Sequence, residues 1–292
     1  MNNIQQKQNT EPFLRLLSAQ RYSYHQAKKI LIIRFSLSLL FAIIGPLLIL
    51  NFAELSTYVA ITAVAYLLVD VLVLRNIENN FRTNGAKIQE EFDTGLFELG
   101  WNEICTGNRI DQELICDYSN KYKAMYSDET LLNWYPQALS QLTLKQAIII
   151  CQRTNTWWDS ALRKSMGWFT GICLTTLTIA VFYLFSKDSN ILFTVLFSLL
   201  PLYEIALDYI RSQITSIQNI SELKTKTEGK IENVLDGVEP TSEELRSIQD
   251  QIFRNRSTAL FVPEWFYFFF RDKQEMQMNH SAEHYVNAIL GE

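Results

Sequence analysis

The sequence lacks the residue patterns that mark most enzymes and cofactor-binding proteins. It contains no P-loop, no dinucleotide-binding glycine pattern and no nucleophile elbow. Two of its three histidines, His280 and His284, are four residues apart on an expected helix. No third ligand accompanies them, so we read them as surface residues rather than as a metal site. We therefore expect no enzymatic activity, no cofactor and no bound metal.

An excess of basic residues and paired cysteines are also missing. The chain has 26 Lys and Arg against 31 Asp and Glu, for a net charge of −5, whereas proteins that bind polymeric nucleic acid neutralise phosphates with a basic surface. The four cysteines have no metal-ligand spacing, and Cys173 lies inside an apolar stretch. We expect four free thiols, a reducing compartment and no polymeric nucleic acid as partner.

Long apolar stretches are what the sequence has instead. Hydrophobic residues make up 48% of its 292 residues, and they are concentrated in four stretches, each long enough for a helix to cross about 30 Å of hydrocarbon. Helices that are apolar all round are hard to bury in a soluble chain of this size. The first stretch follows a polar N-terminal segment and lacks a cleavage pattern, so it is not a signal peptide. The predicted spans are Leu31–Leu50, Leu55–Leu74, Trp168–Phe185 and Ile191–Ile210.

The positions of the basic residues predict the orientation of these spans. The two short connections, 51–54 and 186–190, contain a single basic residue, Lys187. Lys and Arg are retained on the cytoplasmic side of a membrane, so the connections should lie outside and both termini inside. The basic residues on the opposite sides of the spans are Lys28, Lys29, Arg75, Arg82, Arg163, Lys164, Arg211 and Lys224.

The polar segments predict helices rather than strands. Apolar stripes continue beyond the second and fourth spans as helical stalks, and Thr143 with Gln146, and Thr241 with Glu244, form capping-box patterns. No alternation of period two requires a sheet. We expect residues 1–10 to be mobile. We also expect the middle segment to be broken into short pieces at Gly95, Gly100 and Gly107.

The predicted fold class is therefore an all-α membrane protein with two transmembrane hairpins. A mainly helical cytoplasmic domain should be built from the N-terminal, middle and C-terminal segments. The expected divisions are 1–30 as a cytoplasmic N-terminal helix, 31–74 as hairpin 1, 75–167 as a cytoplasmic helical segment, 168–210 as hairpin 2, and 211–292 as a stalk with C-terminal helices.

Four ionisable residues lie within the predicted spans, where a charge is costly and usually faces a partner or water. Arg34 lies in the first span, Asp70 in the second, and Glu204 and Asp208 in the fourth, four residues apart on one helix face. One interpretation is a set of buried ion pairs, Arg34 with Asp70 or Glu204, with Asp208 reaching interfacial water. The other is an acidic lining of an aqueous path, which would favour cations in a symmetric oligomer.

Several unusual short phrases are dispersed over nearly the whole chain. They are Gln8-Asn9, Ala19-Gln20-Arg21, Ala27-Lys28, Phe92-Asp93, Leu96-Phe97, Trp101-Asn102, Asn133-Trp134-Tyr135-Pro136, Cys151-Gln152-Arg153, Trp158-Asp159, Gln249 to Arg254, Val262 to Tyr267, Arg271-Asp272-Lys273, Gln277-Met278-Asn279 and Ser281-Ala282-Glu283. Together with the four spans, these phrases resemble the bacterial family of SMODS-associating four-transmembrane effectors.

The resemblance implies a role in antiphage defence by cyclic-oligonucleotide signalling (CBASS), in the bacterial inner membrane. In such systems a nucleotidyltransferase makes a cyclic nucleotide, and a membrane effector then kills or arrests the cell. The expected partners are the lipid bilayer, further copies of the chain in a homo-oligomer, and the cyclic nucleotide as activating ligand. A pore-forming effector is the first hypothesis, and a membrane-anchored sensor or scaffold that recruits cytoplasmic partners is the second.

A nucleotide ligand needs cations for its phosphates and flat rings for its bases. Two groups of residues offer both kinds of side chain, although their aromatic members also suit a protein core or a membrane-interface belt. The candidates are Arg153 with Trp157 and Trp158, and Arg254 and Arg256 with Trp265, Tyr267, Arg271 and Lys273.

Overall fold

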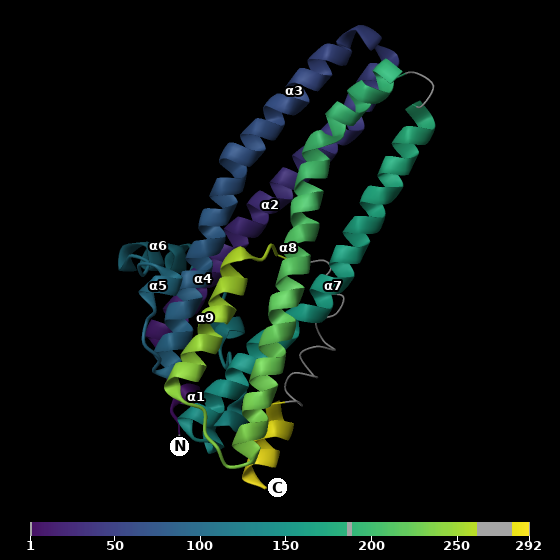
Figure 1. Ribbon diagram of the computed structural model, residues 1–292. Helices are drawn as coiled ribbons and strands as arrows, with labels where there is room; N and C mark the ends of the chain where they lie inside the picture. Colours follow the sequence, from purple (N-terminus) through teal and green to yellow (C-terminus); the bar gives the residue numbers. More distant parts are fainter. Residues whose placement is uncertain (1, 186–188, 262–281, 292) are drawn as a thin grey trace. The chain divides into compact units, whose positions relative to one another are not determined.

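The computed structural model describes residues 2–185, 189–261 and 282–291, without the side chains of residues 128, 157–166, 184, 185, 190 and 194. All regular structure in this part of the chain is helical (Figure 1), which confirms the predicted all-α class. The elements are α1 (Ile4–Lys7), α2 (Glu11–Asn51), η1 (Ala53–Leu55), α3 (Ser56–Val69), η2 (Asp70–Leu74), α4 (Arg75–Phe97), α5 (Glu103–Thr106), α6 (Gln112–Lys123), η3 (Asp128–Leu131), η4 (Gln137–Gln141), α7 (Leu144–Phe185), α8 (Ser189–Leu235) and α9 (Ser242–Thr258), followed by a helical stretch at 282–290.

Three of the helical segments are long and apolar enough to cross a membrane. They are Glu11–Asn51, Ala53–Phe97 and Ile191–Leu235, and a shorter apolar stretch, Gly167–Tyr183, lies within α7. The helices that contain the second and fourth predicted spans continue well past their apolar parts, to Phe97 and Leu235. The predicted helical continuations are therefore confirmed. In the described part of the chain the regular structure is thus all helical, and its long apolar helices are typical of a multi-pass membrane protein.

The chain divides into two units, each assembled from separate segments. We call Gln26–Asn80 with Lys164–Ile214 the hairpin unit, and Met1–His25 with Phe81–Arg163 and Thr215–Glu292 the composite unit. Four long helices, α2, α4, α7 and α8, contribute residues to both units.

The hairpin unit packs around a small apolar core and leaves large apolar side chains on its outside. The core residues are Ile49, Val59, Val181, Val195 and Leu199. At one point α2 and α8 approach closely, because a Cβ added to Gly45 would lie 2.7 Å from the Cβ of Ser198. Outward-facing apolar residues are typical of a surface that contacts lipid rather than water. They include Ile32, Leu40, Leu47, Ile61, Leu68, Leu72, Ile172, Ile179 and Phe193.

The composite unit has a larger core made by segments far apart in the sequence. Phe92 and Leu96 of α4 pack with Ile148 of α7 and Ile252 of α9. Both predicted capping boxes are present: Gln146 N–H donates to Thr143 Oγ1 and Glu244 N–H to Thr241 Oγ1, and each side chain at the third position returns the bond. These caps fix the first turns of α7 and α9, since they satisfy backbone donors that a helix start leaves unpaired.

The prediction that the first ten residues are mobile is wrong. Ile4 is 1% exposed, and the Asn2 amide donates to the carbonyls of Leu139 and Leu142 at 2.6 and 3.0 Å. The Gln8 side chain accepts from the Tyr135 N–H at 2.9 Å. Polar side chains in this segment therefore bind backbone groups that would otherwise be unsatisfied.

Gly95 does not interrupt the chain, as we had expected, but lies inside α4, which continues to Phe97. A Cβ there would stand 3.1 Å from the ring of Phe13, so the glycine allows α2 to pack closely. Gly100 and Gly107 do follow the ends of helices α4 and α5.

Candidate functional site: two buried polar clusters

A fully buried arginine lies at the centre of a charged cluster in the hairpin unit. The Arg34 side chain is 0% exposed, and its Nε and Nη2 donate to the two carboxylate oxygens of Asp70, each at 2.8 Å. Its Nη1 donates to Glu78 Oε2 at 2.6 Å. A planar guanidinium fits a carboxylate through two parallel bonds. The structure thus contains the Arg34–Asp70 pair of the ion-pair interpretation, and it adds Glu78.

A local change in helix geometry lets Asp70 and Glu78 reach the same arginine. Residues eight apart on a regular α-helix differ by two full turns and about 80°, which would point the two carboxylates in different directions. Asp70, however, opens the π-helical segment η2, Asp70–Leu74. A π turn takes up more residues per turn, so the angle between the two side chains shrinks and both face Arg34.

A second arginine joins this cluster to α8. Arg75, the first residue of α4, donates from Nη1 to Glu204 Oε1 at 3.0 Å and pairs through Nη2 with Asp208. The other oxygen of Glu204 lies 3.9 Å from Arg34 Nη2, and it is buried without a hydrogen bond from the described part of the chain. Side-chain exposures of 30%, 24% and 22% for Arg75, Glu204 and Asp208 contrast with the complete burial around Arg34.

The less buried carboxylates of the cluster are those on α8. Glu204 and Asp208 share the guanidinium of Arg75, and one oxygen of Glu204 is buried without a hydrogen bond among the described residues. A charged group among apolar helices is costly unless it meets a cation, a proton or water. The α8 side of the cluster is therefore suited to respond to a change in its surroundings.

The second cluster lies in the composite unit and has its carboxylates fully engaged. Tyr135 Oη donates to Asp93 Oδ1 at 2.7 Å, and Arg256 Nη1 donates to Asp93 Oδ2 at 2.6 Å. Gln249 Nε2 donates to Glu90 Oε2 at 2.8 Å, while Arg246 pairs with Glu90 Oε1. Every oxygen of the two buried acids has a partner, which is the condition for a buried polar network to stabilise a fold.

Burial governs the protonation of groups in this network. Burial raises the pKa of Glu90, although Arg246 and Gln249 act in the opposite direction. Burial also raises the pKa of Tyr135 and of the Cys151 thiol well above their usual values, and the charge of Asp93 raises both further. Burial by itself lowers the pKa of Arg256, but Asp93, Tyr135 and Tyr24 together outweigh it, so the pKa is raised overall. Tyr135 and Cys151 therefore stay protonated at neutral pH and do not offer a nucleophile.

The three described nucleotide-binding candidates, all arginines, have different partners. The guanidinium of Arg153 lies 4.6 Å above the ring of Tyr285, and its Nη2 is 3.4 Å from Glu228. Arg254 is exposed with Nε 3.4 Å from Cys105 Sγ, whereas Arg256 is held by Asp93. The side chains of Trp157 and Trp158, and residues Trp265, Tyr267, Arg271 and Lys273, lie outside the described residues, so their role stays a prediction.

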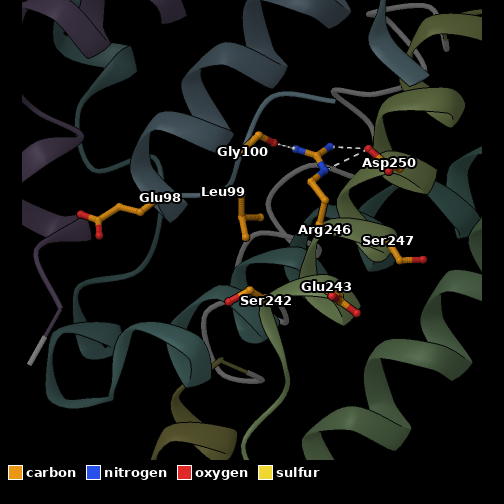
Figure 2. Close-up of a pocket in the computed structure, with 8 residues that line it drawn as sticks. All are labelled: Glu98, Leu99, Gly100, Ser242, Glu243, Arg246, Ser247 and Asp250. Atoms are coloured by element: carbon orange, nitrogen blue, oxygen red, sulfur yellow. Dashed lines mark hydrogen bonds and ion pairs between the residues drawn. The ribbon is translucent and has the colours of Figure 1, made fainter. Parts of the chain in front are cut away.

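An open hollow of about 410 Å³ lies beside α9. Figure 2 shows the guanidinium of Arg246 at its edge, directed at the Gly100 carbonyl and at Asp250, to which it donates at 3.1 and 3.0 Å. The one cation of the lining is thus already paired, and the other charged groups are acidic, which disfavours a phosphate ligand. The lining residues are Glu98, Leu99, Gly100, Ser242, Glu243, Arg246, Ser247 and Asp250.

We call the charged cluster of the hairpin unit, which contains Arg34, Asp70, Arg75, Glu78, Glu204 and Asp208, the membrane cluster. Sequence reasoning missed Arg75 and Glu78 as members of it. Both follow the last apolar residue of the second span, Leu74, and read as the ordinary polar flank of a membrane helix. They lie one and four residues past that span on a helix that continues, and this position was the available signal that their side chains could reach the charges inside the span. Among the described residues no group of three His, Cys, Asp or Glu side chains is arranged to hold a metal.

Comparison with known proteins agrees with this architecture. The model of the SMODS-associating 4TM effector domain matches residues 2–285. A protein of Bacillus cereus (strain VD146), described as a probable CBASS effector molecule, is 30% identical over 290 residues, which cover 94% of this chain and 95% of that protein. No solved structure matches the chain. The chain therefore belongs to the family of SMODS-associating 4TM effectors.

Proposed function

We propose that this protein is a CBASS effector that crosses the bacterial inner membrane four times and permeabilises it on receipt of a cyclic oligonucleotide signal. Besides the three long apolar segments, the apolar stretch of α7, Gly167–Tyr183, extended to Phe185, makes the third crossing in chain order. Both termini and the composite unit lie in the cytoplasm, as the distribution of basic residues indicates. The protein acts as a homo-oligomer and without catalysis. Its family membership and the description of its Bacillus relative support the CBASS role.

The observation that carries the pore proposal is the pair of acidic side chains on α8 in the hairpin unit. Glu204 and Asp208 share the guanidinium of Arg75 and keep part of their side chains exposed. Apolar helices that served only as an anchor would gain nothing from such costly residues. Repeated around an oligomer axis, the acidic side chains would line a path for cations.

A leak assay tests the proposal. The full-length protein is placed in vesicles of phosphatidylethanolamine and phosphatidylglycerol, and potassium efflux is followed during addition of individual cyclic dinucleotides and trinucleotides. We expect one of these compounds to raise efflux, because a ligand that binds the open state more tightly shifts the population towards it. No efflux above empty vesicles with any compound would refute permeabilisation.

The second candidate function is a membrane-anchored sensor or scaffold. The composite unit favours it, because this unit has its own large core and the buried carboxylates of Glu90 and Asp93 are fully hydrogen-bonded. Replacing the two hairpins by unrelated membrane anchors separates the two functions. Retained protection of cells against phage would support the scaffold, and lost protection with an intact composite unit would support the pore.

A further inference from the structure

The membrane cluster consists of two parts that connect different elements. The buried part, Arg34 with Asp70 and Glu78, joins α2 to η2 and α4, so that it lies within the first helical hairpin and its stalk. The more exposed part joins that stalk to α8 of the second hairpin. There Arg75 supplies both of the close ionic contacts.

Arg75 also neutralises the residues that are best placed to attract cations. Glu204 and Asp208 are four apart on α8 and face the same way, and each receives one terminal nitrogen of the same guanidinium. With the guanidinium in place, the local charge of this pair is reduced. Without it, two carboxylates on one face of α8 would present a strong field to any water-filled space beside them.

The contacts that α8 makes with the cluster are less completely hydrogen-bonded than those of Arg34 with Asp70 and Glu78. One oxygen of Glu204 is buried without a hydrogen bond among the described residues and has only the 3.9 Å approach of Arg34 Nη2. Arg34, by contrast, has three short bonds to Asp70 and Glu78. A movement between α4 and α8 would therefore break the Arg75 contacts and leave the bonds of Arg34 to Asp70 and Glu78 intact.

We propose that Arg75 is the counter-charge that holds the resting pore closed to cations, and that its separation from Glu204 and Asp208 on activation exposes these two carboxylates as the selectivity residues. This inference rests on the proposed function. It assigns Arg34, Asp70 and Glu78 to holding the hairpin together in both states.

The experiment compares wild-type protein with Arg75→Gln in the vesicles described above, without any nucleotide. The variant should show potassium efflux about tenfold above the wild type at rest, the change that loss of partly buried ion pairs makes in a two-state equilibrium. Its reversal potential in a potassium chloride gradient should show cation selectivity. Adding Glu204→Gln and Asp208→Asn to Arg75→Gln should keep the efflux and remove the selectivity.

Three controls make the result specific. Arg109→Gln removes an arginine that stacks on Trp101 in the composite unit and should leave efflux unchanged. Arg75→Lys keeps the charge but loses the two-pronged geometry, so its efflux should fall between those of the wild type and Arg75→Gln. Size-exclusion chromatography in detergent should give the same oligomer for all variants.

The outcomes separate this inference from the proposed function. A wild type that leaks on addition of a cyclic nucleotide, together with a correctly assembled Arg75→Gln that does not leak at rest, would overturn the inference alone. Vesicles that leak with neither protein under any condition would overturn both. If Arg75→Gln does not assemble, the triggered wild type is compared with Glu204→Gln/Asp208→Asn, and an unchanged reversal potential would then refute the assignment.

Discussion

The two buried polar clusters of this protein differ in how completely they are satisfied. In the composite unit, all four oxygens of Glu90 and Asp93 accept hydrogen bonds from Arg246, Gln249, Arg256 and Tyr135. In the hairpin unit, Glu204 and Asp208 share the single guanidinium of Arg75, and one oxygen of Glu204 lacks a hydrogen bond within the described chain. The first arrangement specifies a single packing of its helices, whereas the second leaves room for an alternative one.

The largest expected effect on stability would come from breaking the Glu90–Asp93 cluster of the composite unit. Asp93→Asn leaves Arg256 buried without its negative partner, and we expect a loss of about 3–5 kcal/mol in the free energy of unfolding. Tyr135→Phe, which removes a single neutral donor to the same carboxylate, should cost about 0.5–1.5 kcal/mol. Thermal unfolding of both variants in detergent measures the difference, and equal losses would contradict the ionic account.

An intermediate effect is expected where α2 and α8 of the hairpin unit approach closely at Gly45. Gly45→Ala puts a methyl group 2.7 Å from Ser198, and overpacking of this kind costs about 1–3 kcal/mol. Gly171→Ala is the matched control, because nothing lies within 4 Å of the added atom and alanine favours the helix. Unfolding in detergent should show a lowered midpoint for Gly45→Ala only; a lowered midpoint for both would point to backbone effects instead.

A smaller effect on stability is expected when a charge is removed from the membrane cluster of the hairpin unit. Glu204→Gln leaves Arg34 with Asp70 and Glu78, and Arg75 with Asp208. Because Glu204 is partly exposed, we expect a loss of no more than about 1 kcal/mol. The same unfolding measurement compares this variant with Asp93→Asn, and a loss as large as that of Asp93→Asn would show that the two clusters do not differ as described.

The smallest effect concerns how the stability contributed by Glu90, in the cluster of the composite unit, depends on pH. Burial raises the pKa of Glu90, so the carboxyl group of Glu90 binds its proton more tightly in the folded protein than in the unfolded chain. The contribution of Glu90 to stability is therefore fully present below its unfolded pKa and decreases as the pH rises through the folded value. The free energy of unfolding of the wild type minus that of Glu90→Gln should increase as the pH falls from 7 towards 4.5. A difference that is independent of pH would contradict the raised pKa.

The sequence predicted the parts of this structure that depend on local pattern. The apolar stretches marked the long helices, and the Thr-x-x-Gln and Thr-x-x-Glu patterns marked the starts of α7 and α9. Arg34, Asp70, Glu204 and Asp208 could be singled out because a charge is conspicuous among apolar neighbours. Whether they line a pore stays a prediction.

The features that sequence reasoning missed depend on contacts between distant segments. The roles of Asn2 and Gln8 could not be predicted, because their partners at 135–142 are more than 120 residues away. The π turn at Asp70 has no local signature, and it determines that Glu78 joins Arg34. Asp93 was part of a recognised phrase, but its partner Arg256 follows 163 residues later.

The discontinuity of the composite unit also orders the events of biosynthesis. Glu90 and Asp93 leave the ribosome more than 150 residues before Arg246, Gln249 and Arg256 of α9. The first hairpin precedes them in the sequence, and the second is synthesised in the interval. Until α9 emerges, the nascent chain carries two carboxylates that belong in a protein interior but must remain hydrated. The membrane helices are thus all translated before the composite unit can close its core, so a ribosome that stalls short of α9 leaves that unit unable to complete its fold.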